Sequence, residues 1–107
     1  MAGDFLIKQG YTVLDYNYRC FFGEIDIVAK DKDTIVFCEV KYRSSLDKGN
    51  PFEAVDYRKQ QIIYKCAMAY LAQVYKGDKP SRFDIIGCTD NKEDGVSFIH
   101  LKNAFWG

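Results

Sequence analysis

Two neighbouring segments set the architecture of the chain: Glu24-Ile-Asp-Ile-Val-Ala-Lys30 and Thr34-Ile-Val-Phe-Cys-Glu-Val-Lys-Tyr-Arg43. Both segments are rich in the β-branched and aromatic residues that favour strands, and Asp31-Lys32-Asp33 between them is a turn signal. We therefore predict a β-hairpin. If its loop is centred on Lys32-Asp33, the residues that face each other have numbers that sum to 65. A one-residue bulge would break this register.

This register places four charged residues on one face of the hairpin. Asp26 faces Glu39 and Glu24 faces Lys41, with the two carboxylates about 5 Å apart at Cβ. The same face is apolar near the turn, at Val28, Ile35 and Phe37, and is therefore expected to be largely covered, with the charges clustered toward one end. The opposite face is predicted to be an uninterrupted apolar surface, made of Ile25, Ile27, Ala29, Val36, Cys38 and Val40.

Facing carboxylates repel each other unless a proton or a cation lies between them. Mg²⁺ prefers one or two carboxylates together with water and phosphate oxygens, so Asp26 and Glu39 are candidate ligands, with Glu24 as an outer ligand. Lys41 could orient an attacking water or stabilise charge on a phosphoryl oxygen. The alternative is a surface salt-bridge ladder that joins Glu24 to Lys41 and Asp26 to Arg43 or another base.

The rest of the chain predicts one domain over residues 1–107, with a mixed sheet packed by helices. A capping pattern at Asn50-Pro51-Phe52-Glu53 marks the start of the long helix. Gly10 ends the short helix, whereas Gly77 and Pro80 end the long one. The remaining predicted elements are a helix over 4–9, a strand over 11–18, a helix over 51–76, and strands over 82–88 and 96–101.

Lys59 lies within the apolar stripe of the predicted long helix. Either its ammonium group extends past the edge of the stripe to solvent, or it reaches an acidic cluster on the adjoining sheet. Elsewhere, His100 is expected to have a structural role, and Asp84 is expected to pair with Arg82 or to line the site.

The 15 basic and 15 acidic residues cancel, which argues against a protein that coats nucleic acid by bulk charge. Any contact with nucleic acid must therefore rest on a local cluster of basic residues. The alternative is that this cluster is simply a solvated face. The cluster is made of Lys41, Arg43, Lys48, Arg58, Lys59 and Lys65.

The four cysteines are too widely spaced for a zinc motif and are expected to be core thiols without disulfides. Without a leader or a spanning segment in the sequence, we expect a cytoplasmic protein with no membrane partner.

The hairpin resembles a known nuclease signature. Gly23-Glu24-Ile25-Asp26-Ile27-Val28-Ala29, followed by Val36-Phe37-Cys38-Glu39-Val40-Lys41-Tyr42-Arg43, is similar to the motif of the PD-(D/E)XK nuclease superfamily. More narrowly, the chain resembles the YraN family of small bacterial proteins, which are similar to archaeal Holliday-junction resolvases. The resemblance implies a restriction-endonuclease-like, mixed five-stranded sheet flanked by helices, and a Mg²⁺ (or Mn²⁺) site at Asp26, Glu39 and Lys41.

One feature departs from the family pattern. Members usually begin with a longer first helix that bears a Gly-x-x-x-Glu pattern, and its glutamate is a further site carboxylate in the resolvases. This chain starts at Met1-Ala2-Gly3-Asp4 with a shortened first helix, so that ligand is expected to be absent unless Asp4 replaces it or the natural N-terminus is longer.

The leading hypothesis is a Mg²⁺-dependent endonuclease that acts on branched DNA. Asp26 and Glu39 would hold the metal, Lys41 would assist and Lys59 would be accessory. Three basic residues would bind the DNA backbone: Arg43, Lys48 and Arg58. Branched substrates would suit a homodimer, since two related cuts need two sites. The alternatives are a non-catalytic module that keeps the nuclease fold and binds nucleic acid or a protein, and a small structural protein with a salt-bridged hairpin.

Overall fold

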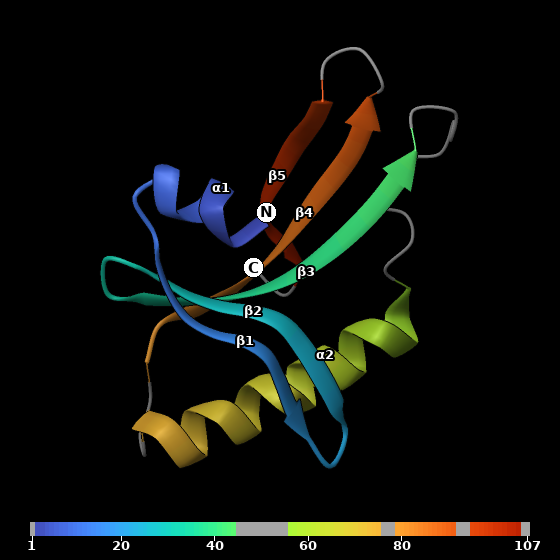
Figure 1. The fold of residues 1–107 in the computed structure, drawn as a ribbon. Helices are drawn as coiled ribbons and strands as arrows, with labels where there is room; N and C mark the ends of the chain where they lie inside the picture. Colours follow the sequence, from blue (N-terminus) through green and yellow to red (C-terminus); the bar gives the residue numbers. More distant parts are fainter. Residues whose placement is uncertain (1, 45–55, 76–78, 92–94, 106–107) are drawn as a thin grey trace.

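The computed structural model describes residues 2–44, 56–75, 79–91 and 95–105 of the chain (Figure 1). The elements are α1 (Ala2–Lys8), β1 (Thr12–Cys20), β2 (Gly23–Asp31), β3 (Thr34–Ser44), α2 (Tyr57–Tyr70), the single π-helical turn η2 (Leu71–Tyr75), β4 (Ser81–Asn91) and β5 (Gly95–Phe105). Their order, a short helix, three strands, a long helix and two strands, is the predicted one. Over the described ranges, none of the helices combines the length and the hydropathy of a membrane-spanning segment.

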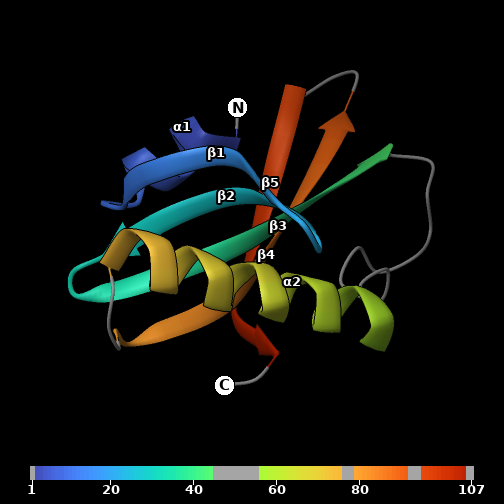
Figure 2. The ribbon, with the colours of Figure 1, turned by 90° about the horizontal axis from the view of Figure 1, so that it is seen from below.

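The five strands form one mixed sheet in the order β1-β2-β3-β4-β5. The β3–β4 pair is parallel, because the chain crosses the sheet through α2 between these strands, and the other three pairs are antiparallel. Helix α2 covers one face of the sheet and α1 the other (Figures 1 and 2). The predicted α/β fold with a mixed five-stranded sheet flanked by helices is therefore confirmed.

Each helix covers its own hydrophobic core. The core under α2 contains Ile25, Val28, Ile35, Phe37, Ile63, Cys66, Ala67, Tyr70, Leu71, Phe83 and Ile85. The core under α1 contains Ala2, Leu6, Tyr11, Ile27, Ala29, Val36, Cys38, Ile86 and Cys88. Because β3 and β4 supply residues to both cores, these strands are buried on both sides, as their long apolar runs indicate.

The predicted register of the β2–β3 hairpin is confirmed near its turn. The pairs run from Ile27↔Cys38 to Asp31↔Thr34, and all have numbers that sum to 65. Lys32 has a positive φ of 56°, as tight hairpin turns require. The predicted cover over Val28, Ile35 and Phe37 is also present, since all three lie in the core under α2.

The prediction that Ile25 shares a face with Ile27 and Ala29 is wrong. Ile25 packs in the core under α2, whereas Ile27 packs under α1. The neighbouring strand changes in the same way: Tyr18 packs against the core under α2, but Tyr16 lies against Gly3 of α1.

The cause is a local break in the pleat of both strands. On β1 the break falls at Asn17, whose φ is 52°, and on β2 it falls at Asp26, between residues paired with Tyr16 and Tyr18. A residue in the left-handed conformation interrupts the alternation of side chains, so the strand on either side presents different faces.

The beginning of α2 also differs from the prediction. The predicted cap at Asn50 and the start at residue 51 lie outside the described residues, but Asp56 has extended φ and ψ of −78° and 176°. Its side chain accepts a hydrogen bond from the Lys59 backbone N–H at 2.8 Å. The described helix therefore begins at Tyr57 with Asp56 as its N-cap, since an aspartate satisfies a free amide of the first turn as well as an asparagine does.

Candidate metal and phosphodiester site

Asp26 lies where β2 separates from β3. The last paired residues are Ile27↔Cys38, and beyond them the Asp26 carboxylate accepts the backbone N–H of Val40 at 2.8 Å. The side chain thus replaces a main-chain acceptor between the two strands. A cavity of about 260 Å³ opens at this point and is lined by Ala2, Gly3, Tyr16, Asn17, Asp26, Ile27, Val40 and Tyr42.

Glu39 is the buried partner of Asp26. Its residue is only 5% exposed, although it carries an ionisable group. Burial, followed by the charge of Asp26 and a hydrogen bond between the two side chains, raises the pKa of Glu39 to about 7. Two adjacent carboxyl groups in a buried place therefore favour the retention of one proton between them near neutral pH.

Two lysines neutralise part of this negative charge. Lys41 Nζ lies 3.7 Å from Glu39 Oε1, and Lys59 Nζ lies 3.8 Å from the same oxygen. Both ammonium groups act to lower the pKa of Glu39, but burial and Asp26 outweigh them. Of the two alternatives for Lys59, the structure therefore has the contact with an acidic group on the sheet.

Three elements, β2, β3 and α2, position these four side chains. Asp26 and Glu39 come from strands on either side of the separation point, Lys41 follows Glu39 by two residues on β3, and Lys59 comes from the first turn of α2. The Asp56 cap fixes that turn, and through it the position from which Lys59 reaches the sheet.

Glu24 does not face Lys41 as predicted. Its carboxylate pairs with Arg19 Nε at 3.0 Å, and the two residues are register partners on β2 and β1. The paired residues of β2 and β3 stop at Ile27↔Cys38, because the strands separate at Asp26, so the predicted pairing does not extend to residue 24. The predicted salt-bridge ladder between Glu24 and Lys41 is therefore not formed.

The three residues predicted to bind the DNA backbone lie in different parts of the chain, and the structure describes them to different extents. Arg58 is exposed in the first turn of α2, next to Lys59. Arg43 lies near the end of β3, and its side chain is outside the described part of the chain. Lys48 lies wholly outside the described residues.

The donor set at this site suits a hard divalent cation. Mg²⁺ is commonly held by one or two carboxylates, with water and substrate oxygens as its other ligands, and Asp26 and Glu39 supply such a pair. Within the described ranges no group of three or more His, Cys, Asp or Glu residues is placed to hold a metal. Asp4, the possible replacement for a first-helix carboxylate, lines a different cavity with Phe5, Lys8, Val96 and Phe98.

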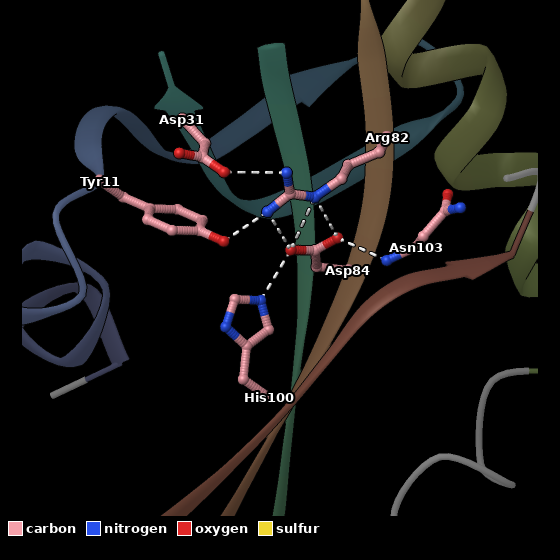
Figure 3. A network of polar contacts seen from close by, with 6 residues as sticks. All are labelled: Tyr11, Asp31, Arg82, Asp84, His100 and Asn103. Carbon is pink, nitrogen blue, oxygen red and sulfur yellow. Dashed lines mark hydrogen bonds and ion pairs between the residues drawn. The ribbon is translucent and has the colours of Figure 1, made fainter.

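A second polar centre lies under α1 and was only partly predicted (Figure 3). Asp84 is fully buried, and its carboxylate binds Arg82 Nε at 3.0 Å and His100 Nε2 at 2.7 Å. The backbone N–H of Asn103 donates to the same carboxylate at 2.9 Å. Although burial acts to raise it, these hydrogen bonds hold the pKa of Asp84 below its ordinary value.

Arg82 connects this carboxylate to β2 and to the residue before β1. Its guanidinium donates to Asp31 at 3.0 Å and to the Tyr11 hydroxyl. The pairing of Asp84 with Arg82 was one of the two predicted roles. Alternation at Arg82-Phe83-Asp84 signalled that both polar side chains share a face, but no local pattern could indicate Asp31, Tyr11 or His100 as partners.

The sequence of this chain matches those of a known protein family. Residues 1–88 match the family described as "Uncharacterised protein family UPF0102". A UPF0102 protein of Caldicellulosiruptor bescii is 47% identical over 98% of this chain and 90% of its own length. Others from Clostridium acetobutylicum and Thermodesulfovibrio yellowstonii are 46% and 43% identical, over 94% and 99% of this chain and 84% and 89% of their own lengths. The chain therefore belongs to the UPF0102 family, which is YraN-like, as the sequence motifs indicated.

Proposed function

We propose that this protein is a metal-dependent phosphodiesterase of the nuclease type, which cuts structured DNA at the site formed by Asp26, Glu39 and Lys41. The observation that carries the proposal is the contact between two carboxyl groups, one of them buried, with two lysine ammonium groups within 4 Å of Glu39. Here the pKa of Glu39 remains raised to about 7 despite both lysines, which is the environment that a divalent cation would complete.

In this proposal each residue has a distinct role. Asp26 and Glu39 would hold Mg²⁺ or Mn²⁺, and the bound metal would supply an activated water and neutralise charge on the phosphodiester. The backbone N–H of Val40 fixes the orientation of the Asp26 carboxylate. Lys41, whose side chain is 20% exposed, can donate to a phosphoryl oxygen as negative charge develops on it.

Lys59 has a positioning role. It contacts Glu39 Oε1 from the side of α2, so it restrains the carboxylate and favours its ionised form. Arg58, exposed beside it, would bind a phosphate of the DNA backbone, and Arg43 and Lys48 would extend this contact. Such contacts hold the substrate without reading its sequence. A homodimer would supply the two sites that a branched substrate needs.

The test is cleavage of labelled four-way-junction and flap DNA in Mg²⁺ or Mn²⁺. Asp26→Asn and Lys41→Ala are each expected to reduce the rate at least about a hundredfold, as loss of a positioned charge does in other active sites. Asp33→Asn, in the exposed hairpin turn, and Lys8→Ala, on the exposed side of α1, are the matched controls. Cleavage that survives both site substitutions would contradict the site assignment.

One observation supports a second candidate function. In the described residues only two carboxylates meet at the site, and no third metal-ligating side chain joins them. This supports the alternative of a non-catalytic module that keeps the nuclease fold and binds DNA or a protein. Binding of junction DNA without cleavage in either metal would favour this alternative.

A further inference from the structure

Two cysteine thiols meet beside α2, about two helical turns after Lys59. Cys20 is the last residue of β1 and Cys66 lies in the third turn of α2, 46 residues later, yet their Sγ atoms are 2.9 Å apart. In a disulfide the sulfurs are about 2.05 Å apart, so the two atoms need to approach by less than about 1 Å. All four cysteines are free thiols in this structure.

Gly23 explains why these two elements come so close. A Cβ atom at Gly23 would lie 2.6 Å from Ile62 Cγ2 and 3.9 Å from Cys66 Sγ, so a side chain there would push α2 away from the β1–β2 turn. The absence of a side chain lets the turn rest directly on Ile62 and Cys66. Cys20, three residues before Gly23, is thereby brought against Cys66.

We propose that Cys20 and Cys66 form a reversible oxidation site, in which a low-molecular-weight disulfide converts the two thiols into an intramolecular disulfide. The site is separate from Asp26 and Glu39 and does not depend on the proposed nuclease activity. The other two cysteines provide a contrast within the chain: Cys38 and Cys88 are buried in the core under α1, on the opposite face of the sheet.

The surroundings of the two thiols differ in a way that sets the order of the reaction. Burial acts to raise the pKa of Cys20, but hydrogen bonds from the Cys66 thiol and from the backbone of Phe22 and Gly23 lower it below its ordinary value. Burial and the neighbouring Cys20 raise the pKa of Cys66 to about 12. Because the thiolate is the nucleophile, Cys20 is the attacking group and Cys66 the resolving group. Cys20 is also partly exposed, so an oxidant can reach it.

The reaction balances with one molecule of the external disulfide. The Cys20 thiolate attacks one sulfur, a bond forms between Cys20 and that half, and the other half leaves as a thiolate that takes up the proton released by Cys20. Cys66 then attacks Cys20 Sγ, the mixed disulfide breaks, and the second half leaves with the Cys66 proton. Two protein thiols are oxidised, and one disulfide is reduced to two thiols.

The new bond would tie the β1–β2 turn to α2. Lys59 lies seven residues before Cys66 on the same helix, which is about two turns and therefore the same face. Oxidation would thus restrain the helix that carries the Lys59 contact to Glu39, and it would raise the melting temperature because it limits the unfolded chain.

The test treats the reduced full-length chain with glutathione disulfide, blocks the remaining thiols with N-ethylmaleimide and maps the peptides by mass spectrometry without reduction. The expected product is a Cys20–Cys66 cross-linked peptide, with Cys38 and Cys88 still reduced. In Cys66→Ala, which preserves a small apolar residue in the core, the reaction should stop at a glutathione adduct on Cys20. Cys38→Ala and Cys88→Ala should each leave the cross-link unchanged.

Three results would overturn the proposal. The first is a stable glutathione adduct on Cys20 of the wild type without a cross-link. The second is cross-linking of Cys20 or Cys66 to Cys38 or Cys88 as fast as to each other. The third concerns the order of reaction: an adduct that forms on Cys66 of Cys20→Ala as fast as on Cys20 of Cys66→Ala would contradict the attacking role of Cys20.

Discussion

The carboxylate of Asp26 accepts the backbone N–H of Val40, 2.8 Å away, at the point where β2 separates from β3. The Asp26 side chain therefore supplies the acceptor for a backbone N–H of β3 at a place where β2 no longer pairs with β3. The same side chain borders the cavity under α1 and contacts Glu39, so one residue links backbone structure to the candidate site.

Substitutions of Asp26 should separate these two roles. Asparagine retains an oxygen that can accept the Val40 N–H, whereas alanine leaves this N–H without its partner. We expect Asp26→Ala to be less stable than Asp26→Asn by about 1 to 2 kcal/mol, measured by urea unfolding at the same pH. Equal stabilities would show that the bond to Val40 contributes nothing.

Glu39 should make stability depend on pH in the absence of metal. Burial and Asp26 raise its pKa to about 7 in the folded protein, from an ordinary value of 4.5. Between these two pH values the folded state binds more protons than the unfolded chain, so the free energy of unfolding falls as the pH rises. Below pH 4.5 Glu39 contributes about 3 kcal/mol to the free energy of unfolding, and above about pH 7 this contribution is lost.

Glu39→Gln should remove this part of the pH dependence. Glutamine is uncharged over the whole range, so urea unfolding of the variant should show a flatter profile than the wild type between about pH 4.5 and 7. Identical slopes in the two proteins would mean that Glu39 titrates normally.

Lys59 should tune the protonation of Glu39. Its ammonium group, 3.8 Å from Glu39 Oε1, lowers the pKa of that carboxyl, so Lys59→Met should raise this pKa further. Lys65→Met on the same helix is the matched control, because the Lys65 ammonium lies over the Phe22 ring instead, 5.5 Å from its centroid. Titration of the Glu39 carboxyl by ¹³C NMR measures both variants, and equal effects would exclude a specific contact with Lys59.

Asp84 should be a large contributor to stability. In Asp84→Asn the half-buried Arg82 and His100 lose the fully buried anion that they share, and breaking a buried pair by removing one partner costs about 3 to 5 kcal/mol. Asp33→Asn, in the exposed turn, should change stability by less than about 0.5 kcal/mol. Urea unfolding near neutral pH compares them, and a loss below 1 kcal/mol in Asp84→Asn would contradict the role of Asp84.

Local sequence patterns predicted much of this fold. The turn at Lys32-Asp33 and the alternating apolar residues were enough to predict the β2–β3 register near the turn. The position of Lys59 in an apolar stripe left two possibilities, solvent or an acidic cluster on the sheet, and the structure has the contact with Glu39.

The features that were not predicted have physical causes outside local patterns. Alternation assumes a regular pleat, so it could not reveal the break at Asn17 and Asp26 that places Ile25 under α2. Asp56 and Asn50 are both suitable caps, and only the folded backbone shows that the described helix starts after Asp56. Contacts between distant residues, such as Cys20 with Cys66, depend on the approach of whole elements.

Calorimetric titration with Mn²⁺ measures whether Asp26 and Glu39 together bind one divalent cation. At about pH 8, where Glu39 is ionised, the wild type should bind one ion per chain, and the affinity should fall about tenfold for each pH unit below about 7 as the proton competes. Asp26→Asn should weaken binding at least about tenfold, while Asp33→Asn should bind as the wild type does. Equal Mn²⁺ affinity in Asp26→Asn and the wild type would show that Asp26 is not a ligand of the ion.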